Sequence, residues 1–190
     1  AAMHHAGPIE EAIFSIDGRY VGTASEDGTA GVWEARTGKE IARLRAHTRA
    51  LQWIDFSPNA QFVATASADG TARLWSNPQG DPISPAIQHG KVVNQVLFSP
   101  DGNLLATASD DGTVAILQVT PEFKSLRSLK HPDHVRQVRW SPDSRHLVTA
   151  CRDGVARIWD VQSGLQAEHP IRTQHGLYLV RYSEDGRTIL

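Results

Sequence analysis

One short phrase occurs four times along this chain at a constant spacing. It begins at Thr23, Thr65, Thr107 and Thr149, where the sequence is TASEDGT, TASADGT, TASDDGT and TACRDGV. A second phrase, FSPDG at Phe98 with close variants elsewhere, keeps the same 42-residue period without insertion or deletion. Such a repeat means that each unit is one small module, which buries its apolar face only by stacking on its neighbours.

Within one unit the local signals are those of strands and tight turns. In the second unit, residues 50–56, 61–67 and 71–75 form short runs of apolar and β-branched side chains, and a weaker run covers residues 83–87. Turn residues separate the runs, and Gly70 is free to adopt a positive φ. Gly, Pro and Asp-Gly recur about every ten residues, which leaves no room for a helix. We therefore expect an all-β chain, a β-propeller of four-stranded antiparallel blades, with about 4.5 blades in an incomplete ring.

The phased phrases resemble those of the WD-repeat β-propeller family, in its bacterial type with closely similar 42-residue blades. The dipeptide that gives the family its name occurs only as Trp159-Asp160, and the other units carry degraded versions of it. The resemblance covers residues 5–190, and we interpret residues 1–4 as a cloning remnant. The expected units are residues 5–46, 47–88, 89–130, 131–172 and a partial unit at 173–190.

The resemblance implies a hydrogen-bonded tetrad that holds each blade together. Its histidines would be His5, His47, His89 and His131, and its turn aspartates Asp27, Asp69, Asp111 and Asp153. The hydroxyl position has Ser25, Ser67, Ser109 and Cys151, and the tryptophan position has Trp33, Trp75, Leu117 and Trp159. A buried indole N–H needs an acceptor and a buried carboxylate needs a donor, so such a chain is physically reasonable. Because leucine has no N–H and cysteine is a weak donor, we expect the first two tetrads to be closed and the last two incomplete.

Composition and motifs narrow the functional classes. A net charge of −2 does not favour nucleic-acid binding, and the single cysteine, Cys151, excludes an internal disulfide. The periodic histidines and aspartates recur in separate blades, so they cannot converge on one metal ion. Ser, His and Asp do occur together within each blade, but the set is repeated, its serine is expected on a buried strand and no Gly-x-Ser-x-Gly elbow is present, so we do not expect a hydrolase triad. The adjacent pair His4-His5 could hold a stray ion, but we expect no cofactor, metal or catalytic site, and we interpret Cys151 as a buried thiol. With no membrane-spanning run visible, we expect a cytoplasmic protein without membrane contact.

Positions that vary between otherwise similar units are the candidates for partner binding. In the resembling family, one face of the propeller, the top, bears the loop before the first strand and the turn between the second and third strands. The candidate residues on this face are Glu10, Glu26, Gln52, Asn94, Asp110, His134, Arg136, Arg152 and Tyr178. The first unit offers acidic residues and the fourth basic ones, which would suit an oriented, charged partner. Ordinary solvated surface charge is the alternative.

These observations predict a non-catalytic protein-interaction scaffold with a protein partner. The expected ring must be completed by the rest of a longer chain, by a homodimer of about eight or nine blades, or by closing alone as a smaller ring. We favour the homodimer. The functional alternatives are a regulatory or sensor segment of a larger signalling protein, a designed or recently duplicated repeat protein without an evolved partner, and, least favoured, a propeller enzyme that uses the central channel.

Overall fold

The computed structural model describes residues 2–120, 123–167 and 169–190, and every regular element named in them is a β-strand. The strands form four antiparallel four-stranded sheets, which we call blades 1 to 4. Blade 1 contains β1 (Ile9–Phe14), β2 (Tyr20–Ser25), β3 (Ala30–Glu34) and β4 (Glu40–Leu44). Blade 2 contains β5 (Leu51–Phe56), β6 (Phe62–Ser67), β7 (Thr71–Ser76) and β8 (Ile87–Gln88). Blade 3 contains β9 (Val93–Phe98), β10 (Leu104–Ser109), β11 (Thr113–Gln118) and β12 (Ser125–Lys130). Blade 4 contains β13 (Val135–Trp140), β14 (His146–Cys151), β15 (Val155–Asp160) and β16 (Ile171–Arg172).

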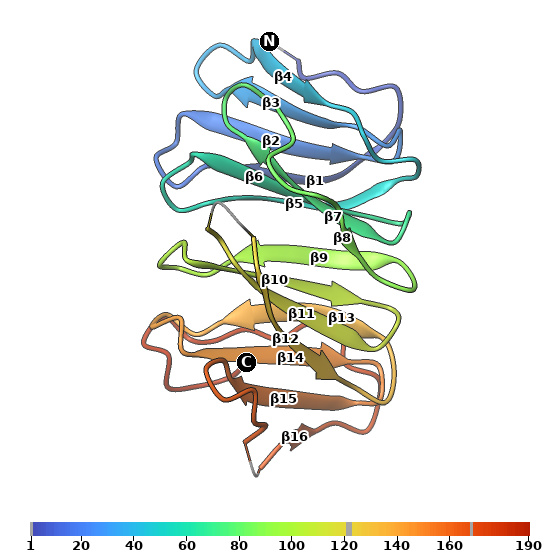
Figure 1. Cartoon of the computed structure of the whole chain (residues 1–190), viewed down its shortest axis with the longest axis vertical. Helices are drawn as coiled ribbons and strands as arrows, with labels where there is room; N and C mark the ends of the chain where they lie inside the picture. The colour runs from blue at the N-terminus through green and yellow to red at the C-terminus, as the bar shows by residue number, and fades with distance from the viewer. Residues whose placement is uncertain (1, 121–122, 168) are drawn as a thin grey trace.

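The blades are stacked face to face in chain order, from blade 1 at one end of the molecule to blade 4 at the other (Figure 1). Within each blade the strands pair in sequence order, so the first and fourth strands form opposite edges. The first strands β1, β5, β9 and β13 contact one another between blades and are therefore the inner strands. The prediction of an all-β chain with four-stranded antiparallel blades is confirmed.

The least regular parts are the outer strands of blades 2 and 4 and the segment that follows blade 4. β8 and β16 have two residues each, and the Pro-containing segment before β8 adds only a bridge between Trp75 and Pro82. This matches the weaker fourth run expected in the second unit. In the partial unit expected at residues 173–190, the pairing named is one bridge, between Tyr182 and Ile189. Val180 of this segment is nevertheless buried against blade 4.

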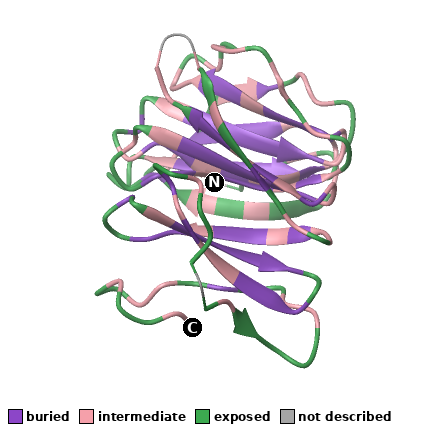
Figure 2. Ribbon diagram, turned by 60° about the horizontal axis from the view of Figure 1, so that its bottom comes forward, coloured by how far each residue is buried: buried purple, intermediate pink, exposed green. Residues whose placement is uncertain are grey.

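The hydrophobic core lies between the blades rather than within them. Small side chains of blade 1, such as Ala24 and Ala30, pack against Ile54 and Phe56 of blade 2. The later boundaries repeat this pairing of a small-residue face with a large-residue face. Figure 2 shows the buried residues concentrated in the central strands of the stack, while β16 is exposed. Each blade depends on its neighbours because one sheet cannot cover its own faces.

The large-residue face of blade 1 has no such neighbour among the described residues. Phe14 is 69% exposed, whereas the equivalent Phe56, Phe98 and Trp140 are 4%, 6% and 8% exposed. Ile9 on the same face is also exposed. We call the surface formed by Ile9, Ala12 and Phe14 the open face of blade 1.

Neighbouring blades are also joined by hydrogen bonds between residues 43 positions apart. The Gln95 side-chain oxygen accepts the backbone N–H of Val138 at 2.8 Å, and the Gln137 oxygen accepts that of Val180 at 2.9 Å. Between blades 2 and 3, Asp55 Oδ2 accepts the N–H of Phe98 at 2.8 Å. The bonds to Phe98 and Val138 satisfy donors on inner strands, and the bond to Val180 satisfies one in the segment after blade 4. The inner side chains thus help to fix the position of the element that packs next.

We expect Gln95→Leu to lower the free energy of unfolding by about 1–3 kcal/mol, because it leaves the buried N–H of Val138 without an acceptor. Urea unfolding monitored by tryptophan fluorescence measures the change. Gln61→Leu, at an exposed position, is the control and should have little effect. Equal stability of the two variants would show that the bond between the blades contributes nothing.

Candidate interaction surface

A chain of side-chain hydrogen bonds crosses blade 2 from the turn to the core. His47 Nδ1 lies 3.0 Å from Asp69 Oδ2, His47 Nε2 lies 2.8 Å from Thr65 Oγ1, and the Trp75 indole N–H donates to Thr65 Oγ1 at 2.9 Å. Burial lowers the pKa of His47 and outweighs the opposing effect of Asp69, so the ring is neutral near pH 7. Burial alone would raise the pKa of Asp69, but hydrogen bonds from Thr71 and Thr48 and the charge of His47 lower it to about 2. Since ionised Asp69 can only accept, Nδ1 carries the ring proton and Nε2 accepts from Thr65.

The hydroxyl of this chain comes from threonine, which corrects the prediction of Ser25, Ser67, Ser109 and Cys151. The members are Thr23, Thr65, Thr107 and Thr149. Positions 65 and 67 share one face of β6, but Ser67 ends the strand, and its hydroxyl serves the backbone of Asp69 and Ala50 instead. The indole N–H of Trp75 donates to the hydroxyl of Thr65 at 2.9 Å. A hydroxyl two residues earlier in the repeat was the signal that the prediction missed.

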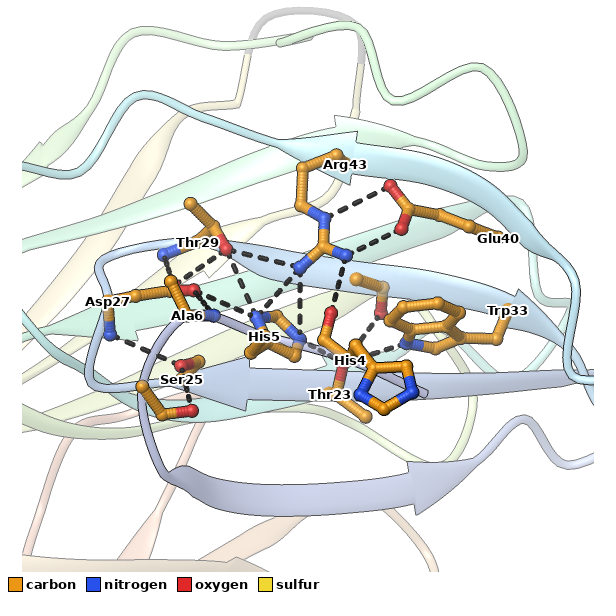
Figure 3. A network of polar contacts seen from close by, with 12 residues as sticks. His4, His5, Ala6, Thr23, Ser25, Asp27, Thr29, Trp33, Glu40 and Arg43 are labelled. Atoms are coloured by element: carbon orange, nitrogen blue, oxygen red, sulfur yellow. Dashed lines mark hydrogen bonds and ion pairs between the residues drawn. The ribbon is translucent and has the colours of Figure 1, made fainter. Parts of the chain in front are cut away.

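The hydrogen-bond network of blade 1 differs from that of blade 2, because Arg43 on β4 binds to His5 (Figure 3). Arg43 Nη1 lies 2.8 Å from His5 Nδ1, and its guanidinium lies over the Trp33 ring at 5.0 Å. An arginine can only donate, so His5 Nδ1 must accept, and the ring proton moves to Nε2, which donates to Thr23 at 2.7 Å. Burial and then the charge of Arg43 lower the pKa of His5. The His5 tautomer is therefore the reverse of that in blade 2, and its 3.4 Å contact with Asp27 is not a direct hydrogen bond. The prediction of a closed tetrad thus holds for blade 2 and is wrong for blade 1, because Arg43 takes the place of the bond between histidine and aspartate.

The networks of blades 3 and 4 are both incomplete, as predicted, although the reason in blade 4 differs. His89 contacts Asp111 at 3.2 Å and Thr107 at 2.7 Å, but Leu117 supplies no N–H. In blade 4, Asp153 is bound by Arg157 at 2.6 Å instead of by His131, whose buried Nδ1 has no hydrogen-bond partner among the residues that the structure describes. Burial, followed by the charge of Arg157, lowers the pKa of His131 to about 4. The missing link is thus between histidine and aspartate, and it does not result from Cys151.

Two positions in each unit were predicted to vary on the top face, one on the inner strand and one directly before the turn aspartate. These two positions lie side by side at one end of every blade. Each inner strand has a register shift at its variable residue, which makes Glu10, Gln52, Asn94 and Arg136 the extra residues of four β-bulges. A bulge takes its extra residue out of the strand ladder and redirects its side chain. The residue before each turn aspartate donates its N–H to the loop that enters the inner strand, for example from Glu26 to the Pro8 carbonyl at 2.9 Å. The repeat thus presents these side chains, whatever their identity, at the same end of each blade.

At the boundary of blades 3 and 4, four of the predicted residues bind one another. Asn94 Nδ2 donates to Asp110 Oδ1 at 2.7 Å and to the Val135 carbonyl at 2.9 Å. Arg136 Nη1 and His134 Nδ1 lie 3.3 Å and 3.4 Å from the same Asp110 oxygen. Asp110 therefore already neutralises part of the basic charge expected in blade 4.

The remaining top-face residues do not belong to that cluster. Glu10 shares a hydrogen bond with Glu26, and this bond, then burial and the repulsion between the carboxylates, raises the pKa of Glu10. Arg152 is exposed, Tyr178 is 64% exposed, and Gln52 is half-buried. The top face thus has an acidic pair on blade 1, a self-paired cluster between blades 3 and 4, and a free-standing arginine beside it.

The interior between the inner strands contains charged groups that the sequence analysis did not single out. The Arg139 guanidinium of blade 4 lies over the Trp53 ring of blade 2 at 5.6 Å. Burial raises the pKa of Asp55 to about 7, against the hydrogen bonds from Phe98 and Phe56 and the charge of Arg139.

No cluster of three or more His, Cys, Asp or Glu side chains in the described ranges could hold a metal ion. Cys151 is a buried free thiol whose pKa is raised by burial, which disfavours a reactive thiolate.

Comparison with known proteins agrees with this architecture. The family model described as "WD domain, G-beta repeat" matches residues 3–34, 38–76, 82–116 and 123–160, one match for each blade. No curated protein matches the chain. Among the described residues there is no helix with the length and apolar character needed to cross a membrane.

The Asp69 carboxylate should make the fold sensitive to acid. Its pKa is about 2 in the fold and 3.8 as the ordinary value, so its contribution is present above about pH 4 and is lost as the pH falls towards 2. We expect Asp69→Asn to lower the unfolding free energy at neutral pH by about 1–2 kcal/mol and to flatten its dependence on pH in that window. Asp81→Asn, at an exposed position, should leave both unchanged. Parallel acid profiles of wild type and Asp69→Asn in denaturant titrations would contradict this.

Proposed function

Because the chain belongs to the WD domain, G-beta repeat family, we propose that it is a non-catalytic scaffold that binds other proteins through its top face. Domains of this family generally mediate protein–protein interaction. The observation that carries the proposal is the set of four β-bulges, which direct non-repeating side chains to one end of a repeating framework. The histidines and aspartates of blades 2 and 3 support a structural role, since they bind each other in the networks within those blades.

The charge on the top face favours a partner with both acidic and basic groups. Glu10 and Glu26 lie close enough to share a proton, so a lysine or arginine of a partner would relieve their repulsion. Arg152 on blade 4 is exposed and offers a site for a carboxylate. The acidic and basic sites lie at opposite ends of the stack, which would fix the orientation of the partner.

A second candidate function, self-association, is favoured by the open face of blade 1. Every later blade buries the residues equivalent to Phe14 against the preceding blade. A second copy that covered the open face would bury Phe14 as the later blades bury its equivalents. Such a homodimer would extend the ring, and it could close at about eight or nine blades.

The top-face proposal can be tested with peptides selected from a random display library against the wild-type protein. We expect most selected peptides to lose affinity for the double variant Arg136→Glu/Arg152→Glu, because the basic part of the surface is reversed. Arg36→Glu/Arg187→Glu, at exposed positions away from the top face, is the control. Peptides that bind all three proteins equally well would exclude the top face as the interaction surface.

Self-association is tested by measuring mass in solution by light scattering over a wide range of protein concentration. We expect a species of twice the chain mass of 20.8 kDa, and we expect Phe14→Asp to return it to the single-chain mass. Leu165→Asp is the control, because Leu165 is 70% exposed but lies outside the open face. A wild-type protein that keeps the single-chain mass at every concentration would contradict the dimer and leave the top-face proposal intact.

A further inference from the structure

A groove of about 690 Å³ lies between blades 3 and 4 at the end opposite to the top face. It lies beside the turn between β13 and β14 and the loop after β15. We call it the 3–4 groove and define it by Leu104, Leu126, Arg127, Arg145, His146 and Val161. Its volume is within the range of about 300–1,000 Å³ that is typical of ligand-binding pockets.

The groove exists because one aromatic position of the repeat is occupied by a leucine. Leu104 begins β10, and the equivalent residues of blades 1 and 2 are Tyr20 and Phe62. Tyr20 stacks on Phe56 of the next blade, with ring centroids 6.4 Å apart. Phe62 lines the corresponding space between blades 2 and 3, a smaller cavity of about 300 Å³. A leucine fills less of the gap than an aromatic ring and leaves the boundary of blades 3 and 4 open.

The walls of the 3–4 groove carry basic charge that the corresponding space between blades 2 and 3 lacks. Arg127, Arg145 and His146 line it, and the equivalent residues one repeat earlier are Pro85, Asn103 and Leu104. The cavity between blades 2 and 3 is lined by apolar side chains and one threonine. The basic groups are therefore particular to this boundary and are not a general property of the repeat.

The positive charge is only partly compensated within the groove. Arg127 is held in place by the Gln162 carbonyl at 2.7 Å and the Leu126 carbonyl at 3.0 Å, and neutral carbonyls leave its charge uncancelled. Arg145 is exposed. The one acidic lining residue, Asp160, accepts hydrogen bonds from the backbone N–H and the hydroxyl of Ser163 at 2.7 Å and 2.6 Å. The groove thus combines an apolar floor at Leu104, Leu126 and Val161 with a basic rim.

We propose that the 3–4 groove is a second docking site, which binds a short acidic segment of a partner protein. Carboxylates of the segment pair with Arg127 and Arg145, and an apolar side chain between them covers Leu104 and Val161. Arginine is suited to this role because its planar group can hold a carboxylate through two parallel hydrogen bonds. The site lies at the opposite end of the blades from the top face and is independent of it.

The direct test is fluorescence anisotropy with a labelled short peptide of alternating glutamate and leucine. We expect the peptide to bind, and we expect its affinity to fall as salt is added, because the paired charges are near the surface. A peptide with lysine in place of glutamate and one with serine in place of leucine are the controls, and neither should bind. No binding of the glutamate–leucine peptide, or equal binding of the lysine peptide, would overturn the proposal.

Two variants locate the site. Arg145→Glu should weaken the glutamate–leucine peptide about tenfold, whereas Arg19→Glu, at the equivalent turn position of blade 1, should not change its affinity. Leu104→Phe should abolish binding without altering charge, because it restores the aromatic residue that Phe62 provides between blades 2 and 3. Thermal unfolding of each variant verifies the fold. Unchanged affinity in both Arg145→Glu and a folded Leu104→Phe protein would show that the peptide binds elsewhere.

Discussion

The contact between neighbouring blades is asymmetric, because a face of small side chains meets a face of large ones. Ala24 and Ala30 of blade 1 leave the space that Ile54 and Phe56 of blade 2 fill, and the next boundaries repeat the arrangement. Close packing of this kind is sensitive to single side chains. One leucine at position 104, where the earlier blades have an aromatic ring, lines the 3–4 groove of about 690 Å³. The same asymmetry explains why the open face of blade 1 shows Phe14 to solvent.

The polar networks follow from the need to satisfy a turn carboxylate in each blade and a buried indole N–H in blades 1, 2 and 4. The repeated threonine hydroxyl makes this possible, since it can accept one proton and donate another. What differs between blades is the cation nearby. Without an arginine in the chain of bonds, His47 carries its proton on Nδ1, whereas Arg43 moves the proton of His5 to Nε2. Arg157 removes Asp153 from the network of blade 4 altogether.

The sequence predicted the features that repeat in every blade, and it missed the contacts that depend on how far individual side chains extend. The period and turn residues were sufficient for four antiparallel blades, the weak fourth strand of blade 2 and the two columns of variable residues. The resemblance implied Ser67, at the end of β6, as the hydroxyl of the tetrad, whereas the Trp75 indole N–H donates to Thr65 two residues earlier on the same strand. The entry of Arg43 and the mutual pairing of Asn94, Asp110, His134 and Arg136 join strands or blades whose relative positions a linear pattern does not encode.

The side-chain bonds from Asp55, Gln95 and Gln137 all run from one blade to the blade or segment that follows it. Together with the unequal faces of each blade, these bonds make the two ends of the stack different, so that one end can bind only to the opposite end of another stack. A head-to-tail contact of this kind is not a two-fold contact between identical patches. Units joined in this way form a closed circle when the rotation per blade divides a full turn, and otherwise they continue as a helical filament. The curvature set by side chains as small as Ala24 therefore determines whether such an assembly has a finite size.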